Sequence, residues 1–321
     1  MLNLIKGGKN IMSNKLGLGT MGMDFSNRDS SIKTIHKALD EGINIFNTGD
    51  FYRQGQSQVI LGEALKDIPR DKYFVSLKFG VTFSKDGASL DVRPENIKKH
   101  LLDSLAKMNL DYVDLYQPAR MDTEIPVEDV VREIKSLIDE GYVRHIGLSE
   151  VDADTLKRAY KIHPIHSVEV EYSLLNREIE QELIKTAKEL GVQVVVYGAV
   201  GHGILTDKVL SGNNPMLNRS ILNDNVKDHN LAILNKFKDI AGNIGLTNNE
   251  LAIAWTQSKY DNITTLIGTT SSDHLMSAIK AINTKLDDND IKLIEETVSM
   301  DTIKGTVMRK WIFTNGVGRM V

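Results

Sequence analysis

A tyrosine and a lysine stand where their side chains could carry out proton transfer. In "GINIFNTGDFY", an apolar run breaks at Asn47 and is soon followed by Tyr52, and in "VSLKFG" Lys78 comes near the end of another apolar run. A lysine ammonium beside a phenol favours the phenolate and lowers the pKa of the tyrosine, which would give a general acid or base near neutral pH. A Tyr52 that packs in a turn and a Lys78 that extends to solvent are equally compatible with the spacing alone.

The elements that must position these residues alternate along the whole chain. Short β-branched or apolar runs occur at "KLGLGT", "INIFN", "YFVSLKF", "YVDLYQ", "VRHIGLS", "HSVEVEY", "VQVVVYG" and "ITTLIGT". The stretches between them repeat apolar residues at helical spacing, as Ile134, Leu137 and Ile138 do. About eight strand-then-helix units predict a (β/α)8 TIM barrel. A doubly wound open sheet is the alternative, although so many repeats are unusual in an open sheet.

In such a barrel, functional side chains lie at the carboxyl ends of the strands. Tyr52 and Lys78 are therefore expected at the same mouth. The predicted strand ends carry the other candidates, which are Thr20 and Met21, Asn47, Gln117 to Arg120, Ser149 and Glu150, Glu169, Tyr197 to Gly203, and Gly268 to Ser271.

The chain shows no division into separate domains. No Pro/Ser-rich linker or charge block interrupts it, so residues 1–321 are expected to form a single domain. The segment "MLNLIKGGKNIMS" is predicted to form a hairpin over the bottom of the barrel. The polar run at 206–230 predicts a long loop after the seventh strand, on the active-site face, and extra helices are expected beside the eight units.

Composition excludes several classes of function. The formal charge of -4 gives no reason to expect nucleic acid or an acidic membrane as a partner. The absence of cysteine excludes disulfides, thiol catalysis and thiolate metal sites, and no apolar run reaches the length of a membrane span. No signal peptide is apparent at the N-terminus, so a cytoplasmic protein is expected. His163 and His166 lack a carboxylate at metal-binding spacing, so no metal site is predicted, and nothing indicates the oligomeric state.

The order of the motifs resembles that of the aldo-keto reductases. The resemblance rests on "LGLGTMGM", "FNTGDFY…LGEAL", "VSLKFG", "DYVDLYQ", "VRHIGLSEV", "VEYSLL", "VVYGAVGHGILT" and "LTNNELAIAWTQSKYDNITTLIGTTSSDHL", which cover nearly the whole chain in register. It implies a (β/α)8 barrel that binds an extended nicotinamide cofactor without a Gly-rich Rossmann loop. It also implies hydride transfer between that cofactor and a carbonyl or alcohol substrate, with Tyr52 as proton donor and Lys78 as its supporting residue.

Four positions depart from the family pattern. The catalytic Asp is Asn47 in this chain, and the catalytic His is Ala119. The Asn and Gln that usually hold the nicotinamide amide are Glu150 and Glu169. The first change is expected to leave Lys78 with a neutral partner, and the direction in which this shifts the tyrosine pKa stays open.

The other changes affect the substrate and the cofactor ring. Ala119 cannot donate to a substrate oxygen, whereas Gln117 or Arg120 could, unless Arg120 only forms a surface salt bridge. A carboxylate at Glu150 or Glu169 would accept from the nicotinamide amide and favour the oxidised, cationic cofactor, which suggests a dehydrogenase. In the alternative, Glu150 points to a helix N-terminus instead.

The resemblance also assigns the remaining cofactor contacts. Tyr197 matches the aromatic residue that stacks on nicotinamide, the stretch Gly198 to Gly203 would follow the pyrophosphate, and Gly268 to Ser271 would hold the adenosine phosphate. The hydroxyls at this end could hold a 2′-phosphate but Asp273 would repel one, so NADP is expected and NAD is close behind. The full set of expected cofactor contacts is Thr20, Met21, Ser149, Glu150, Glu169, Tyr197, Gly198, Ala199, Gly201, Gly203, Gly268, Thr269, Thr270 and Ser271.

The sequence therefore predicts a nicotinamide-dependent oxidoreductase that interconverts a small carbonyl compound and an alcohol. A cofactor-binding barrel with little or no turnover, serving as a redox-sensing or regulatory subunit, is the alternative from another class. An unrelated barrel lyase or hydrolase would need a carboxylate pair or metal ligands that the strand ends lack. Trp255 is predicted to lie in the core, and Trp311 either closes over the mouth with the tail or contacts a neighbouring subunit.

Overall fold

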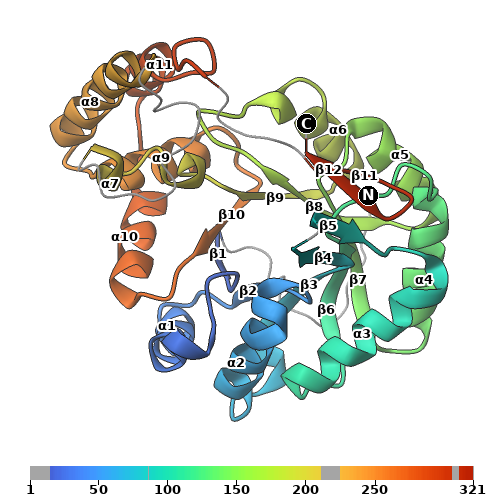
Figure 1. Cartoon of the computed structure of the whole chain (residues 1–321). Helices are drawn as coiled ribbons and strands as arrows, with labels where there is room; N and C mark the ends of the chain where they lie inside the picture. Colours follow the sequence, from blue (N-terminus) through green and yellow to red (C-terminus); the bar gives the residue numbers. More distant parts are fainter. Residues whose placement is uncertain (1–14, 86, 211–224, 306–310, 321) are drawn as a thin grey trace.

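Eight parallel strands close into a barrel (Figure 1) in the order β1-β10-β9-β8-β7-β6-β3-β2. The structure is a computed structural model that describes residues 15–85, 87–210, 225–305 and 311–320. The barrel strands are β1 (Leu16–Gly19), β2 (Ile45–Gly49), β3 (Phe74–Phe79), β6 (Val113–Pro118), β7 (Val143–Ser149), β8 (Ile165–Glu171), β9 (Gln193–Tyr197) and β10 (Ile263–Gly268). Each coincides with a predicted run, so the (β/α)8 prediction is confirmed and the doubly wound sheet is wrong.

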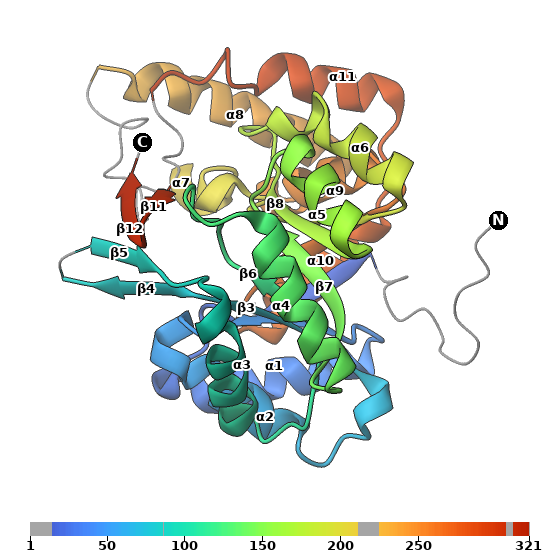
Figure 2. The same ribbon diagram turned by 90° about the vertical axis from the view of Figure 1, so that its right-hand side faces the viewer.

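Helices cover the outside of the barrel. Those that follow the repeat are α1 (Arg28–Asp40), α2 (Gln56–Leu65), α3 (Pro94–Met108), α4 (Val127–Asp139), α5 (Ala153–Ile162), α6 (Leu183–Leu190), α9 (Asn248–Ser258) and α10 (Ser272–Asn283). The extra helices are α7 (Asp207–Leu210), α8 (Lys227–Ile244) and α11 (Asp288–Thr297), and α8 packs against α11 on one side of the barrel in both views (Figures 1 and 2). Short 3-10 turns are η2 (Phe25–Asn27), η3 (Tyr52–Gly55), η4 (Arg70–Lys72), η5 (Glu178–Glu180) and η6 (Gly201–Gly203).

Local sequence signals explain where several helices begin and end. Asp152 caps α5 by accepting a hydrogen bond from the backbone N–H of Thr155. After α1, α4 and α6 the chain turns through Gly42, Gly141 and Gly191, whose positive φ angles suit a residue without a Cβ. These signals are local, and for that reason they could be recognised in the sequence.

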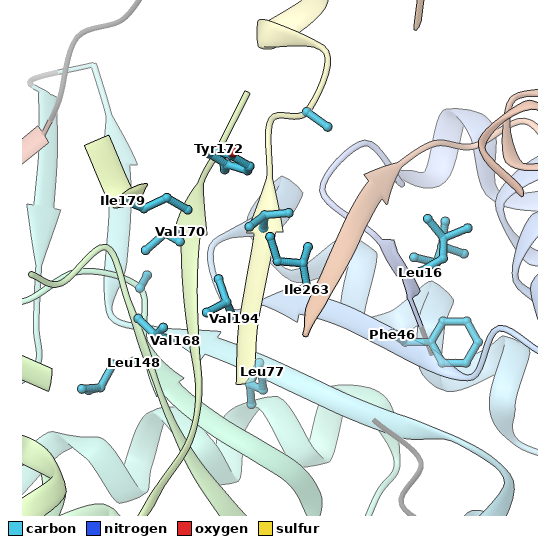
Figure 3. Packing of buried hydrophobic residues seen from close by; sticks show 14 of the residues in the cluster. Leu16, Phe46, Leu77, Leu148, Val168, Val170, Tyr172, Ile179, Val194 and Ile263 are labelled. Atoms are coloured by element: carbon cyan, nitrogen blue, oxygen red, sulfur yellow. The ribbon is translucent and has the colours of Figure 1, made fainter. Parts of the chain in front are cut away.

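Two apolar layers hold the barrel together. An outer layer between strands and helices includes the side chains of Phe46, Leu77 and Val168 (Figure 3). Inside the barrel, a smaller cluster from five strands fills the lower part and consists of Ile45, Phe74, Leu115, Val195 and Leu266. Because side chains alternate across a strand, the residues two or four positions beyond this cluster also point inward. Four of these positions hold the polar residues Asn47, Ser76, Lys78 and Gln117, which belong to the candidate site described below.

A second, antiparallel sheet lies beside the barrel and was not predicted. Its order is β11-β12-β5-β4, with β4 (Val81–Ser84) and β5 (Gly87–Leu90) directly after β3, and with β11 (Trp311–Thr314) and β12 (Val317–Met320) from the tail (Figure 2). The carboxylate of Asp122, after β6, accepts hydrogen bonds from the backbone N–H groups of Asn315 and Gly316. The tail is therefore fixed to the barrel at the end of β6.

Some predictions fall outside the described part of the chain. The predicted N-terminal hairpin, residues 1–13, lies wholly outside the described residues. Residues 211–224 of the predicted long loop also lie outside them, while α7 and the start of α8 occupy the two ends of that loop. Trp255 is fully buried, so its predicted place in the core is confirmed. Across the ranges described, no helix combines the length and the apolar character that a membrane crossing requires.

Candidate functional site

A cluster of polar side chains fills the upper interior of the barrel. The ammonium of Lys78 on β3 donates to Oδ1 of Asn47 on β2 and to Oε1 of Glu169 on β8, with both distances 2.5 Å. The amide of Asn47 donates in turn to Oε2 of Glu169 at 2.7 Å. The three side chains thus form a closed triangle, and each is at least 96% buried, with exposed fractions of 2% to 4%.

Two further residues complete this cluster. The amide of Gln117 on β6 donates to Oε2 of Glu169 at 2.7 Å and to the hydroxyl of Ser76 at 3.3 Å. Both amide hydrogens of Gln117 are therefore engaged inside the barrel, while its Oε1 has no partner among the described residues. Glu169 consequently accepts hydrogen bonds from three strands at once.

The structure corrects the expectation that Lys78 has only a neutral partner. Glu169 supplies a buried carboxylate, and the pair is shielded from solvent. Burial acts to lower the pKa of Lys78, but the ion pair with Glu169 outweighs it and the pKa is raised. Lys78 is therefore an ammonium at neutral pH.

Tyr52 lies immediately above this cluster in a strained turn. It opens η3, in which Arg53 and Gln54 have φ angles of 49° and 56°, a left-handed conformation that is costly for residues with a Cβ. The Lys78 ammonium lies 5.4 Å from the centroid of the Tyr52 ring, and the ring of Phe51 packs edge-on against it at 4.7 Å. Tyr52 is 9% exposed.

The direction of the Tyr52 pKa shift, which the sequence left open, is upward. Burial raises the pKa of this phenol, the Lys78 ammonium lowers it, and the Glu169 carboxylate raises it again, with a net upward shift. A neighbouring lysine alone would lower the pKa of the phenol, whereas burial and the Glu169 carboxylate both raise it. Tyr52 therefore carries its proton at neutral pH.

Asp50 has a structural role in the same turn. Its Oδ2 accepts from the backbone N–H of Gly80 at 3.1 Å and lies 3.1 Å from Nδ1 of His100 on α3. These contacts fasten the end of β2 to the end of β3. They join the turn that carries Tyr52 to the end of β3, which carries Lys78.

A second polar group lies at the ends of β6 to β9. The guanidinium of Arg120 donates to the Tyr197 hydroxyl at 3.3 Å and to the Ala119 carbonyl at 2.6 Å. Glu150 has a φ of 54°, and its carboxylate accepts from the backbone N–H of Glu171 at 2.7 Å. Because Asp152 caps α5, the alternative in which Glu150 occupies that helix N-terminus is wrong.

Two hollows border the turn and this second group. One of about 580 Å³ is lined by Arg120, Glu150, Glu171, Tyr197 and, from the tail, Ile312, so the tail contributes to the mouth. The other, of about 770 Å³, is lined among others by Asp50, Phe51, Arg53, Phe83 and His100 on the outer side of the turn. Neither is lined by Tyr52 itself, which is covered in this structure.

The predicted phosphate end consists mainly of backbone. Gly198, Gly201 and Gly203 have φ angles of 75°, 56° and 93°, and a Cβ at Gly198 would lie 3.0 Å from Cγ of Glu171. Ser271 caps α10 through the N–H of His274, and the Thr269 hydroxyl accepts from the N–H of Ser271. This leaves N–H groups at the start of α10 available to an anion.

The remaining predicted contacts lie at the same mouth. Thr20 donates to the carbonyl of Asn47 at 3.2 Å, and the Met21 side chain is 64% exposed. The hydroxyl of Ser149 is fully buried and has no hydrogen-bond partner in the part of the chain that the structure describes. Thr270 follows Thr269 in the turn between β10 and α10, and Ala199 and Gly268 lie at the ends of β9 and β10.

Sequence reasoning missed two features of the site. The ion pair between Lys78 and Glu169 joins residues 91 positions apart, yet both changes from the family pattern were visible, an acid replaced at position 47 and an acid introduced at position 169. Lys33 of α1 was missed as well, because it is remote in sequence from Ser272, beside which it lines a surface hollow. The paired changes at positions 47 and 169 were the sequence signal that could have revealed the ion pair. No comparable signal pointed to Lys33.

Comparison with known proteins supplies independent information. The profile of the aldo/keto reductase family matches residues 15–299. The chain is 33% identical over 308 residues to "Probable aldo-keto reductase 1" of Glycine max, across 91% of this chain and 87% of that protein. Among solved structures it is similar to the glycerol dehydrogenase AKR11B4 from Gluconobacter oxydans, with a TM-score of 0.75, 25% identity, and coverage of 88% of this chain and 90% of that chain.

It is equally similar to the aldo-keto reductase AKR11C1 from Bacillus halodurans in its holo form, with a TM-score of 0.75, 26% identity, and coverage of 89% and 92%. The match therefore extends over the barrel and both polar groups at its mouth. The chain belongs to the aldo/keto reductase family and is, in general terms, a nicotinamide-dependent oxidoreductase of carbonyl and alcohol groups.

Proposed function

We propose that this protein reduces a small aldehyde or ketone with Tyr52 as proton donor and Lys78 as the charge that supports it. The observation that carries the proposal is the placement of Tyr52 directly above a charged Lys78, with the phenol protonated at neutral pH. A neutral phenol is the form that can give a proton to a carbonyl oxygen. The nearby ammonium then stabilises the phenolate that remains.

The second polar group suits the oxygen of the substrate. Arg120 is the residue we assign to it, because its guanidinium lines the 580 Å³ hollow, whereas the Gln117 amide is already engaged with Glu169 and Ser76. A guanidinium keeps its charge throughout and can donate in several directions. In this arrangement Arg120 holds the substrate oxygen in place of the family's histidine.

The residues at the mouth fit a nicotinamide dinucleotide. Tyr197 offers a flat ring, the glycines at 198, 201 and 203 add no side chains to the turn that follows it, and the start of α10 offers backbone N–H groups. The buried, unpartnered Ser149 hydroxyl is a candidate partner for the carboxamide. When bound, the cofactor supplies the hydride that adds to the carbonyl carbon.

We favour NADP, with NAD as the alternative. The hydroxyls of Thr270, Ser271 and Ser272 suit a 2′-phosphate, and Lys33 of α1 lies beside Ser272 as an exposed base. Asp273 in the first turn of α10 opposes it. Because Glu169 is paired with Lys78, it contributes little net negative charge at the cofactor ring, which weakens the argument for a preference for the oxidised form.

The test is the loss of reduced-cofactor absorbance when the protein meets NADPH or NADH with a panel of small aldehydes. Tyr52→Phe removes the proton donor and should reduce turnover by about 10²–10⁴-fold. Tyr116→Phe is a matched control, since this buried hydroxyl donates only to the Ile97 carbonyl. Equal activity of Tyr52→Phe and the parent protein would contradict the proposed role. Tight cofactor binding without turnover in the parent would instead support a sensing or regulatory barrel.

A further inference from the structure

The carboxylate beside Lys78 comes from the strand opposite the one that holds Asn47 in the cluster. Glu169 lies on β8 and Asn47 on β2, and both contact the same ammonium at 2.5 Å. Their side chains also contact each other, with the Asn47 amide donating to the carboxylate at 2.7 Å. One acid and one amide therefore share a single lysine between them.

We infer that Glu169 is the positioning residue that keeps Lys78 charged beside Tyr52, and that the acid and the amide at positions 169 and 47 are interchangeable as a pair. The catalytic consequence of this inference rests on the proposed function, whereas its geometric basis is independent of that function. Glu169 acts on Tyr52 through Lys78, without a direct hydrogen bond to the phenol among the described residues.

Lys78 depends on one carboxylate for its counter-charge. The lysine side chain is 5% exposed and that of Glu169 is 3% exposed, so water contributes little to the solvation of either charge. A buried ammonium without a counter-ion releases its proton more readily. In the part of the chain that the structure describes, Glu169 is the carboxylate within ion-pair distance of Lys78.

The hydrogen-bond pattern fixes the position of the Glu169 carboxylate. Its Oε1 faces Lys78, while its Oε2 accepts from Asn47 and Gln117. Asn47 cannot rotate its amide without placing an N–H against the ammonium, so its Oδ1 stays on Lys78. Exchanging the acid and the amide would keep one negative charge on the lysine and one amide across from it.

The other groups around Lys78 do not supply an alternative charge. Tyr52 faces it from the turn after β2, and Ser76 and Gln117 are neutral. Arg120, at the end of β6, influences the phenol of Tyr52 as a second cation. Glu169 is therefore the source of the negative charge that Lys78 faces in the described part of the chain.

The experiment is an NMR titration of lysine labelled at Cε, with the Lys78 signal assigned by its loss in Lys78→Met. Glu169→Gln should move the titration of Lys78 downward, toward neutral pH, and N47D/E169Q should return it toward that of the parent protein. Glu171→Gln is the matched control, because Glu171 is also buried on β8 but lies beside His202. It should leave the Lys78 titration unchanged.

Turnover supplies a second measurement. Glu169→Gln should reduce kcat/KM at neutral pH by roughly ten- to a hundredfold, and N47D/E169Q should recover most of the loss. A purely structural role would lower stability but leave the pH profile of the folded fraction in place. If Glu169→Gln does not fold, the N47D and N47D/E169Q variants still provide the test. A Lys78 pKa that is lower in N47D/E169Q than in the parent protein would contradict the proposal that the acid and the amide can be exchanged.

The two proposals fail separately. A parent protein without turnover would remove the proposed function, while the lysine titration would still test the role of Glu169. Normal turnover together with an unchanged Lys78 titration in a folded Glu169→Gln variant would overturn the inference and leave the proposed function intact.

Discussion

The two ends of the barrel each hold an ion pair, and the pairs are built differently. At the carboxyl ends, Lys78 and Glu169 are enclosed among side chains from β2, β6 and β8. At the amino ends, Arg70 and Asp114 are 22% and 14% exposed, and their remaining hydrogen bonds go to the backbone, including the Tyr73 carbonyl and the Val75 N–H. The lower pair joins strand ends to one another, whereas the upper pair supports another side chain.

Backbone strain is distributed in the same unequal way. The non-glycine residues with positive φ in the turns at the carboxyl ends are Arg53, Gln54, Glu150 and His202. At the opposite end, Asn109 adopts this conformation as the C-cap of α3, where asparagine is well suited to it. Strain that persists in costly residue types is typical of functional sites. These differences indicate that the amino ends of the strands contribute to the stability of the fold, whereas the carboxyl ends keep strained turns that lower stability and position catalytic side chains.

The largest effect is expected from removing both members of the upper pair. The double variant of Lys78→Met and Glu169→Gln should lower turnover by about 10²–10⁴-fold, because Tyr52 loses its cation. Its free energy of unfolding should fall by less than the roughly 3–5 kcal/mol expected when one partner of a buried pair is removed alone, because the double variant leaves no unpaired charge in the barrel. Enzyme assays and chemical denaturation measure the two quantities. A large loss of stability would show that the upper pair holds the fold together.

The lower pair should behave in the opposite way. Arg70→Met should lower the free energy of unfolding by about 2–3 kcal/mol, because it leaves the mostly buried Asp114 carboxylate without its partner, and kcat should not change. Arg144→Met is the matched control, since Arg144 stacks on the same Tyr112 ring at 4.0 Å but is exposed, and it should cost under about 1 kcal/mol. Equal losses in both variants would contradict the structural role given to the lower ion pair.

The sequence predicted the barrel better than the site because the signals differ in range. All eight strands and the caps of several helices follow from patterns within about ten residues, as in the period of two in β3. The sheet of β4, β5, β11 and β12 joins the region after β3 to the tail, and its short strands carry little pattern. Likewise, Tyr52 and Lys78 were identified from motifs, but the ion pair of Lys78 with Glu169 depends on which strands close the barrel.

Acid pH should destabilise the lower end selectively. His166 stacks on His145 at 4.3 Å between ring centroids, and burial lowers the pKa of His166 to about 4. Below about pH 6.5 this histidine binds a proton in the unfolded chain but not in the folded chain. The stability that the neutral His166 contributes is therefore fully present above that pH and is lost as the pH falls toward 4. Between pH 7 and pH 5 the loss should be about 1–2 kcal/mol.

His166→Phe should remove most of this pH dependence, because Phe74 already stacks against the same ring and an aromatic replacement keeps the packing. The remainder belongs to His145, whose pKa burial also lowers. Thermal unfolding at several pH values measures it. His163→Phe, at the C-terminus of α5, is the control and should retain the parent profile. A His166→Phe profile that matches the parent would assign the acid sensitivity to another group.

The smallest effect concerns the strained turn itself. A left-handed conformation costs a residue with a Cβ about 1–2 kcal/mol, and the flexibility of glycine in the unfolded chain returns about 0.4–1 kcal/mol of any gain. Gln54→Gly should therefore raise the free energy of unfolding by about 0.5 kcal/mol. Asn109→Gly, at the lower end, should change it by less, because asparagine tolerates this conformation.

Turnover separates the two ends more clearly than stability does. Gln54 lies between Tyr52 and α2, so a freer backbone there should let the phenol leave its place above Lys78 and lower kcat, whereas Asn109→Gly should not affect it. Denaturation and kcat measured on both variants provide the test. A more stable Gln54→Gly protein with unchanged kcat would mean that the strain in this turn does not help to position Tyr52. The buried cluster around Lys78 would then be the remaining feature at this end of the barrel that links lower stability to catalysis.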